Sequence, residues 1–335
     1  YQNLCELLGG SFIDVADPAV GLNPFPLVQH YETHAGPDGG IEDGEGDVLE
    51  ALLGAMAAET EPLTDFQRQT LSRVMHALWA LHGPAMTIDQ IAHALIAEDD
   101  QRACDIGIQL FAFTSHGSFG RFFAGANTMR LDNRLVVLEL EHLKQRKHLQ
   151  RVVLLQLIYQ IQQAMYLGDR SRRKIVIIDE AWDLLTSGEV GKFIETGYRR
   201  FRKYNGSAIV ITQSLGDLYT NPVGEAITAN SAITFQLAQQ GRTLEMLAGQ
   251  QKLPGSIGLD TLKSIHIAPG RYAELAIISN RGSGVARLVV SPFLQLLYST
   301  KPEDVAAIAA LRSARGASMP SLITCGARRP HTTSS

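Results

Sequence analysis

The sequence predicts an α/β fold built on a mostly parallel sheet. Two short apolar runs, residues 175–178 and 208–212, are each followed at once by polar side chains, as expected for strands buried on both faces of such a sheet. A stretch with helical periodicity, residues 189–204, separates them, and this alternation is typical of parallel strands with helices on both faces. Residues 46–115 show helical periodicity alone, which predicts a small all-helical subdomain inserted into the α/β chain.

Length and composition describe a globular chain of about two domains. The 335 residues are 45% hydrophobic and 19% charged, and the net charge of −4 gives no general reason to expect nucleic-acid binding. The three cysteines lie far apart, so neither a disulfide framework nor a zinc motif is predicted, and a reducing, cytoplasmic setting fits. His30 and His34 have the spacing of a helical zinc pair, but their segment has the composition of a loop, so we expect no stable zinc site.

Periodicity and capping residues place the elements in order. A helix closed by Gly9-Gly10 opens the chain, and two capping-box patterns, Thr64 with Gln67 and Thr87 with Gln90, predict helix starts in the all-helical part. Further strands are predicted at residues 11–15, 135–140, 232–237, 272–279 and 285–290, with a long helix at 141–168 that is apolar on one face.

These patterns divide the chain into five segments. The first and fourth belong to the α/β core, the second is a mobile loop rich in glycine and acids, and the third is the all-helical insertion. The fifth is a C-terminal helix followed by a disordered tail. The expected bounds are residues 1–30, 31–45, 46–130, 131–300 and 301–335.

Two acids at the end of the first apolar run are the main candidates for chemistry. Asp179 and Glu180 lie at the carboxyl end of the predicted strand, where ligands bind in open α/β sheets. One acid there can hold the magnesium ion of a nucleotide, and a second can accept a proton from an attacking water. We therefore expect Asp179 to be the Mg²⁺ ligand and Glu180 the catalytic base. The alternative is that both acids only cap the helix that follows.

Residues around the second apolar run extend this candidate site. Gln213 follows that run directly, in a position from which it can orient water beside a terminal phosphate. Arg200 lies with two further arginines on the helix between the runs, and Arg287 lies near the end of the core. Either arginine can reach a neighbouring subunit's nucleotide as an arginine finger. The alternatives are an ordinary turn for Gln213 and a solvated basic face for the arginines.

A phosphate-binding loop of the GxxxxGK[ST] type is absent from the sequence. The nearest match, Gly191-Lys192, has Thr186 in place of the first glycine and Phe193 in place of the hydroxyl residue. Such a loop supplies the backbone amides and the lysine that hold the β- and γ-phosphates. We therefore expect this chain alone to be inactive as an ATPase.

Five segments in combination carry a family resemblance: YQNLCELLGGSFIDV, LNPFPLV, VIIDEAWDLL, GYRRFRKYNGSAIVITQS and GSGVARLVVSPFLQLLYST. They resemble the conjugative type IV secretion ATPases of the TraC kind, over most of residues 1–300. The resemblance implies a RecA-like P-loop NTPase core with an inserted all-helical subdomain, and ATP and Mg²⁺ as ligands. It also implies that Asp179 and Glu180 are the Walker B acids and that Gln213 is the sensor glutamine. Its match of Arg200 or Arg287 to a finger is looser.

The resemblance also sets expectations for the whole protein. In this family the phosphate loop and a separate amino-terminal domain lie upstream, so we expect the natural chain to begin before Tyr1. Family members form ring-like homo-oligomers, expected here to be hexamers, peripherally on the cytoplasmic face of the bacterial inner membrane. There they contact inner-membrane components of the secretion system and, transiently, DNA or pilin, and they couple ATP hydrolysis to pilus assembly and substrate transfer.

Two alternatives stay open on the sequence. A DNA-pumping ring ATPase of the FtsK or HerA sort would share the fold, although a chain that is not globally basic is poorly suited to a large DNA footprint. A non-hydrolysing structural subunit would keep the fold and use its surface for assembly. The missing phosphate loop would favour that second alternative if the natural chain began near Tyr1.

Overall fold

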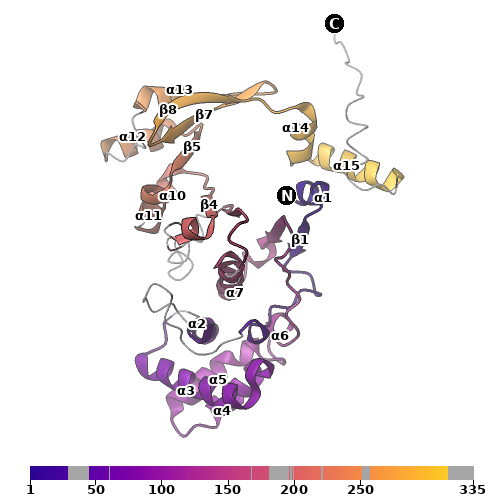
Figure 1. The fold of residues 1–335 in the computed structure, drawn as a ribbon, viewed down its shortest axis with the longest axis vertical. Coiled ribbons are helices and arrows are strands. Elements are labelled where there is room, and N and C mark those ends of the chain that lie inside the picture. Colours follow the sequence, from indigo (N-terminus) through magenta and orange to yellow (C-terminus); the bar gives the residue numbers. More distant parts are fainter. Residues whose placement is uncertain are drawn as a thin grey trace. The chain divides into compact units, whose positions relative to one another are not determined.

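The computed structural model describes residues 1–28, 45–59, 61–166, 168–180, 196, 198, 200–219, 222–250 and 257–315. The chain forms two compact units (Figure 1), of which unit 1 takes Tyr1–Ser11 with Asp169–Ser335 and unit 2 takes Phe12–Gly168. The predicted mobile loop at residues 31–45 lies outside the described residues except for Glu45, and the predicted tail beyond Arg315 lies outside them entirely.

Unit 2 is mainly helical. A two-stranded sheet, in which β1 (Ser11–Asp14) pairs with β2 (Val136–Glu139), accompanies the helices. The unit is therefore wider than the predicted insertion at residues 46–130, since it also holds most of this sheet and the long helix that follows it. Its helices are α2 (Glu45–Ala57), α3 (Asp65–His82), α4 (Ile88–Ile96), α5 (Gln101–Leu110), α6 (Gly120–Phe123) and α7 (Lys147–Tyr166), with short 3-10 turns at η1 (Phe25–Leu27), η2 (Gly83–Ala85), η3 (Phe111–Phe113) and η4 (Glu141–Leu143).

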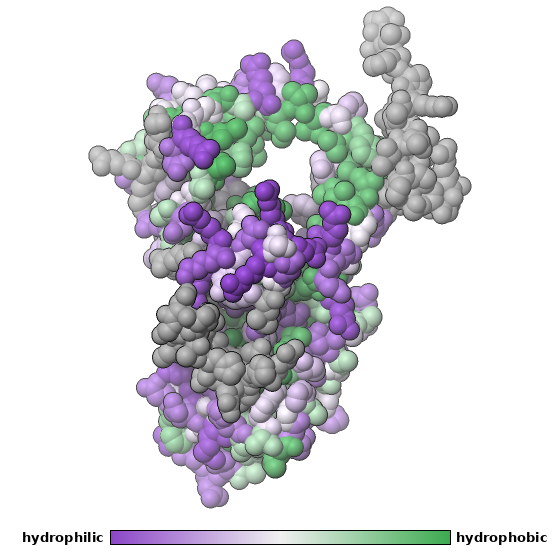
Figure 2. Space-filling view, in the orientation of Figure 1, coloured by the Kyte–Doolittle hydropathy of each residue, from purple (hydrophilic) through white to green (hydrophobic). Residues whose placement is uncertain are grey.

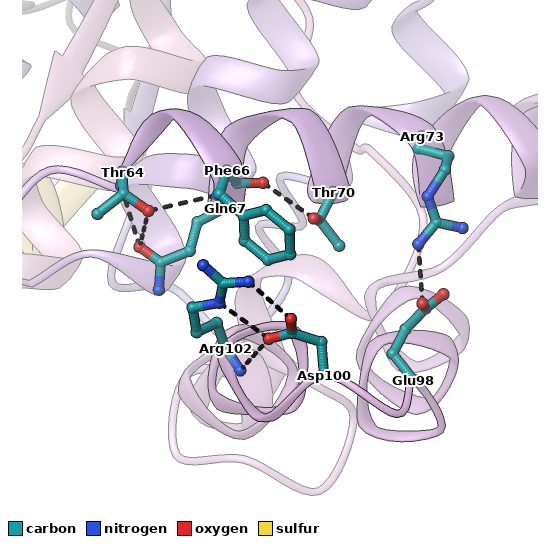
Figure 3. Close-up of polar contacts among 8 residues, drawn as sticks. All are labelled: Thr64, Phe66, Gln67, Thr70, Arg73, Glu98, Asp100 and Arg102. Carbon is teal, nitrogen blue, oxygen red and sulfur yellow. Dashed lines mark hydrogen bonds and ion pairs between the residues drawn. The ribbon is translucent and has the colours of Figure 1, made fainter.

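Side-chain caps fix where the helices of unit 2 begin. At the start of α3 the Thr64 hydroxyl accepts the Gln67 N–H and the Gln67 side chain accepts the Thr64 N–H, and α4 repeats the arrangement, so both predicted capping boxes are present. Asp100 caps α5, and its carboxylate also binds the Arg102 guanidinium, which lies 3.6 Å from the centroid of the Phe66 ring (Figure 3). This stack links the start of α5 to α3.

The core of unit 2 is one continuous apolar cluster. Phe113 is fully buried, with its ring centroid 5.2 Å from that of Phe119, 5.6 Å from that of Phe123 and 5.2 Å from that of His148. The helix α7 contributes buried residues from several sides, among them Val152, Leu157 and the polar Gln156. The prediction that this helix buries a single apolar face is therefore wrong. Elements from both ends of unit 2 thus share one core.

In unit 1, β3 (Lys174–Ile178) and β4 (Gly206–Val210) pair in parallel with Ile178 opposite Val210, as predicted. The helix predicted between them at residues 189–204 is described only in part. Residues 196, 198 and 200 are helical, and η5 (Phe201–Tyr204) ends at Asn205, whose φ of 57° is the left-handed conformation that asparagine tolerates at a helix end.

The last strands differ from the expected orientation. The strands β5 (Ile233–Leu237), β6 (Ile267–Ala268), β7 (Tyr272–Ser279) and β8 (Gly282–Leu288) form a separate sheet in which β7 pairs antiparallel with the other three. Because Ser279 lies opposite Gly282, only a two-residue turn joins β7 to β8, whereas a parallel pair needs a crossover of a dozen or more residues. The other helices that the structure describes in unit 1 are α1 (Gln2–Leu7), α10 (Leu215–Tyr219), α11 (Pro222–Asn230), α12 (Gly241–Gly249), α13 (Leu259–Ser264), α14 (Pro292–Tyr298) and α15 (Pro302–Arg315).

The strands of unit 1 are not buried on both faces, which corrects the prediction for both β3 and β4. Ile175 and Ile177, on one face of β3, are 63% and 60% exposed. One face of the antiparallel sheet is likewise apolar and exposed, whereas its other face covers a small core of residues from α10, α12 and α13. Green surface over the part of unit 1 that holds β7 and β8 is visible in Figure 2. The exposed face of this sheet carries Ile233, Phe235 and Leu237 from β5, Leu275 and Ile277 from β7, and Leu288 from β8.

Candidate functional site

The parallel pairing of β3 and β4 brings their carboxyl ends to the same edge of the sheet. The Ile211 N–H donates to the Ile178 carbonyl at 2.9 Å, so the pairing continues to the last residue of β3. Asp179 and Glu180 follow β3 immediately, and Gln213 follows β4 by three residues. The three predicted site residues therefore lie together, as expected for side chains at the ends of neighbouring parallel strands.

Gln213 and Glu180 are in direct contact. The Gln213 Nε2 group donates to both carboxylate oxygens of Glu180, at 2.9 Å each. Because both oxygens share one amide donor, the Glu180 carboxylate is held in a single orientation while it remains exposed to solvent. A general base that accepts a proton from water needs a carboxylate that is both accessible to the water and held in one orientation.

Glu180 has an unusual backbone conformation. Its φ of 53° lies in the left-handed region, which costs about 1–2 kcal/mol for a residue other than glycine. Its N–H donates to the Asp179 Oδ1 atom at 3.0 Å, a local bond that supports the sharp turn at the end of β3. Strained residues of this kind cluster at active sites, so the conformation supports a functional reading of Glu180 over simple helix capping.

Asp179 has a partner from the start of the chain. The Tyr1 hydroxyl donates to the Asp179 Oδ2 atom. This hydrogen bond, with smaller contributions from burial and from the charges of Asp179 and Glu180, raises the pKa of Tyr1 to about 12. A tyrosine is protonated at neutral pH even at its ordinary pKa of 10, so the raised pKa only extends the alkaline range over which the Tyr1 hydroxyl remains a donor.

The donor set at this edge suits magnesium better than a transition metal. Asp179 and Glu180 offer hard carboxylate oxygens, and Mg²⁺ is commonly held through one or two carboxylates together with substrate phosphates and water. Within the described part of the chain, no three His, Cys, Asp or Glu side chains gather into a closed metal site. His30 and His34 lie outside that part.

Comparison with protein families identifies the chain. A model of the family described as the TraG P-loop domain matches residues 91–324. The chain belongs to the TraG P-loop domain family. This match and the similar proteins described next together confirm the P-loop NTPase fold class and the predicted resemblance to type IV secretion ATPases.

Similar proteins agree with the TraG P-loop assignment. The chain is 27% identical to the protein TraC of Escherichia coli K12 over 325 residues, which cover 91% of this chain and 35% of TraC, so it spans about a third of that relative's length. In structure it is similar to VirB4 of Thermoanaerobacter pseudethanolicus, with a TM-score of 0.68 and 19% identity, covering 89% of this chain and 81% of the VirB4 chain. It is also similar to the plasmid coupling protein TrwB, with a TM-score of 0.51 and 13% identity, covering 84% and 74% of the two chains.

Neither predicted arginine lies beside Glu180 within this TraG P-loop domain. Arg200 directly precedes η5, at the amino end of β4, and a strand of five residues separates it from the carboxyl-end site by about 17 Å. Arg287, on β8, binds Glu274 through its Nε atom at 3.1 Å and lies 4.4 Å from the centroid of the Tyr272 ring. Arg199 and residues 181–195, which include Gly191-Lys192, lie outside the described residues.

Two residues at the site carry no signal in the sequence pattern. Tyr1 reaches Asp179 across 178 positions of sequence, and no local motif marks it. The Gln239 side chain, after β5, accepts the Leu215 N–H at 3.4 Å and so connects the end of β5 to the segment that follows Gln213. Both contacts depend on the packing of distant segments, which periodicity does not report.

Among the described residues of this TraG P-loop domain, no helix has both the length and the apolar composition of a membrane span.

Proposed function

We propose that this TraG P-loop domain is part of the ATPase motor of a conjugative type IV secretion system. The observation that carries the proposal is the Gln213 amide on both oxygens of Glu180, directly beside Asp179. Three polar groups at adjacent strand ends match the needs of phosphoryl transfer to water, which depends on positioning and charge stabilisation.

Each side chain has a distinct role in this proposal. The Asp179 carboxylate offers an oxygen to Mg²⁺, which when bound neutralises negative charge on the phosphates of ATP. The Glu180 carboxylate accepts a proton from the attacking water. Gln213 holds that carboxylate in place through its amide N–H groups, and its amide oxygen can accept a hydrogen bond from the same water.

The ligand class is supported by a structural neighbour. TrwB was solved with a non-hydrolysable GTP analogue, which supports a nucleoside triphosphate as the ligand of this fold. We propose ATP with Mg²⁺ here. In this proposal the groups that hold the β- and γ-phosphates of ATP come from residues outside this chain, because its sequence contains no GxxxxGK[ST] loop. This chain alone is accordingly inactive.

Assembly completes the proposal. The whole protein forms a ring-like homo-oligomer, a hexamer, peripherally on the cytoplasmic side of the bacterial inner membrane, where it contacts inner-membrane components of the secretion system and, transiently, DNA or pilin. Arg200 or Arg287 acts as a finger toward the nucleotide of the next subunit, since neither lies beside Glu180 in its own chain. For Arg287 this requires release from Glu274.

The test is Mg²⁺-dependent ATP turnover by the protein at its natural length. Glu180→Gln is expected to bind ATP normally and to lose about 10²–10⁴-fold in turnover, as loss of a positioned base does. Glu303→Gln, which removes the same charge from the exposed first turn of α15, is the matched control and should keep full activity. Retained turnover in Glu180→Gln would refute the base assignment. No turnover in the wild-type protein, with assembly intact, would favour a structural subunit.

A further inference from the structure

We infer that Tyr1 is a positioning residue for the metal ligand Asp179: its hydroxyl fixes the carboxylate in the orientation from which Mg²⁺ is bound. The inference rests on the proposed role of Asp179. It goes beyond that role because it assigns a function to a residue outside the strand-end motifs.

The position of Tyr1 is set by a helix. The Cys5 N–H donates to the Tyr1 carbonyl at 3.0 Å, so the Tyr1 backbone makes the first hydrogen bond of α1. Cys5 is fully buried, and α1 packs against α14, while Gln2 and Glu6 bind each other along the exposed side of α1. Tyr1 therefore reaches Asp179 from a packed element.

The two oxygens of Asp179 are held from different directions. Oδ2 accepts the Tyr1 hydroxyl and Oδ1 accepts the Glu180 N–H at 3.0 Å. Two donors, one on each oxygen, stop the carboxylate from rotating about its terminal bond. Because each carboxylate oxygen has two lone pairs, both oxygens keep a lone pair for a cation. Among the contacts that the structure describes, the backbone donor alone would orient this exposed side chain if Tyr1 were absent.

The chemistry of the donor also matters. Tyr1 is a neutral donor, and no ion pair joins Asp179 to a basic side chain in the part of the chain that the structure describes. An arginine or lysine in its place would offset the negative charge that attracts a divalent cation. Tyrosine orients the ligand and leaves its charge available, which is the usual work of hydrogen-bond partners behind metal ligands.

The experiment compares Tyr1→Phe with the wild-type protein at natural length. Mn²⁺ binding in the presence of a non-hydrolysable ATP analogue, followed by electron paramagnetic resonance, is expected to weaken about tenfold. The Mg²⁺ concentration for half-maximal turnover should rise by the same factor, while nucleotide binding without metal stays unchanged. Tyr298→Phe, which removes a hydroxyl with no hydrogen bond among the described residues, is the matched control.

A double-mutant cycle separates positioning from a general structural effect. If Tyr1 acts through Asp179, then Tyr1→Phe adds nothing to the loss of Mn²⁺ affinity caused by Asp179→Asn. Additive losses, or unchanged metal affinity in Tyr1→Phe, would overturn the inference and leave the proposed function intact. A wild-type protein with neither metal-dependent nucleotide binding nor turnover would instead remove the proposed function itself. Tyr1 is 69% exposed, so the phenylalanine variant keeps the fold.

Discussion

The two units of the chain treat their apolar residues in opposite ways. Unit 2 encloses them in one continuous cluster that includes the buried rings of Phe113, Phe122 and Phe123. Among its described residues, unit 1 encloses a small cluster beneath β7, whereas apolar side chains on its strands, such as Ile177 of β3 and Phe235 of β5, are exposed to solvent. The difference teaches that an apolar strand in a sequence indicates a face that favours burial, without indicating which segment buries it.

The largest test of this contrast is Phe113→Ala. Removing a fully buried ring from unit 2 should lower its free energy of unfolding by about 3–5 kcal/mol, since the packed neighbours cannot fill the cavity. Phe111→Ala, two residues away and 56% exposed, is the matched control and should cost less than about 1 kcal/mol. Urea dependence of hydrogen exchange in α4 and α5 measures both. Equal losses in the two variants would mean that the core of unit 2 around Phe113 is not tightly packed.

A second test concerns the close contact between α4 and α5 in unit 2. A Cβ atom at Gly107 would lie 2.7 Å from both the Ala92 carbonyl oxygen and the Ile96 Cγ1 atom, so Gly107→Ala should cost about 1–3 kcal/mol by forcing α5 away from α4. At Gly54 in α2 the added Cβ would meet only Leu63, at 3.7 Å. Gly54→Ala should therefore stabilise the unit by about 0.5–1 kcal/mol through helix propensity. The unfolding temperatures of the two variants measure these effects. A Gly107→Ala variant as stable as the wild-type protein would mean that α4 and α5 are loosely packed.

A third test asks how open the exposed face of unit 1 is. Ile177→Thr, at a side chain that is 60% exposed, should change stability by no more than about 0.5 kcal/mol. Ile278→Thr, on the covered face of β7 and 7% exposed, should cost about 1–3 kcal/mol because a hydroxyl enters the small core. Urea unfolding of the chain measures the pair. If Ile177→Thr were as costly as Ile278→Thr, the face of β3 would be buried in solution and the contrast between the units would shrink.

The smallest expected effect is a pH dependence in unit 2. The hydrogen bonds from Arg102 lower the pKa of Asp100 from 3.8 to about 2. A carboxyl group whose pKa is lowered in the folded state stabilises it above pH 3.8, and this contribution is lost as the pH falls toward 2. Asn caps a helix as well as Asp does, so Asp100→Asn should keep α5. Its free energy of unfolding should decrease less steeply than that of the wild-type protein as the pH is lowered. Unfolding curves at pH 5 and pH 2.5 test this, and identical slopes in the two proteins would contradict it.

How far the sequence predicts the fold depends on the distance over which each feature is determined. The capping boxes at Thr64 and Thr87 involve residues three positions apart, and they are present where the sequence predicts them. The parallel pairing of β3 and β4 follows from the helical stretch between them. The pairing of β5 with β7 joins segments that are distant in sequence, so local patterning gives no sign of its antiparallel direction. The two-residue turn between β7 and β8 is Asn280-Arg281, which is not one of the glycine-containing pairs typical of such hairpin loops, so the sequence pattern does not indicate the antiparallel pairing there either.

The same distinction applies to the candidate site. Asp179, Glu180 and Gln213 are recognisable because each follows an apolar run, and the structure brings them together, although their catalytic roles stay predictions. Tyr1 and Gln239 join the site through contacts that only tertiary packing creates. The arginines show the limit of residue type as a guide, since Arg287 is engaged by Glu274 within its own sheet.

The left-handed backbone of Glu180 has a consequence for how this protein can change. At that position glycine would relieve the strain and asparagine would reduce it, so either would make the turn after β3 more stable. Neither carries a carboxylate that Gln213 can hold. If turnover depends on Glu180 as proposed, stability and activity are in conflict at residue 180. A screen for thermostability alone would then select substitutions at this position that abolish turnover.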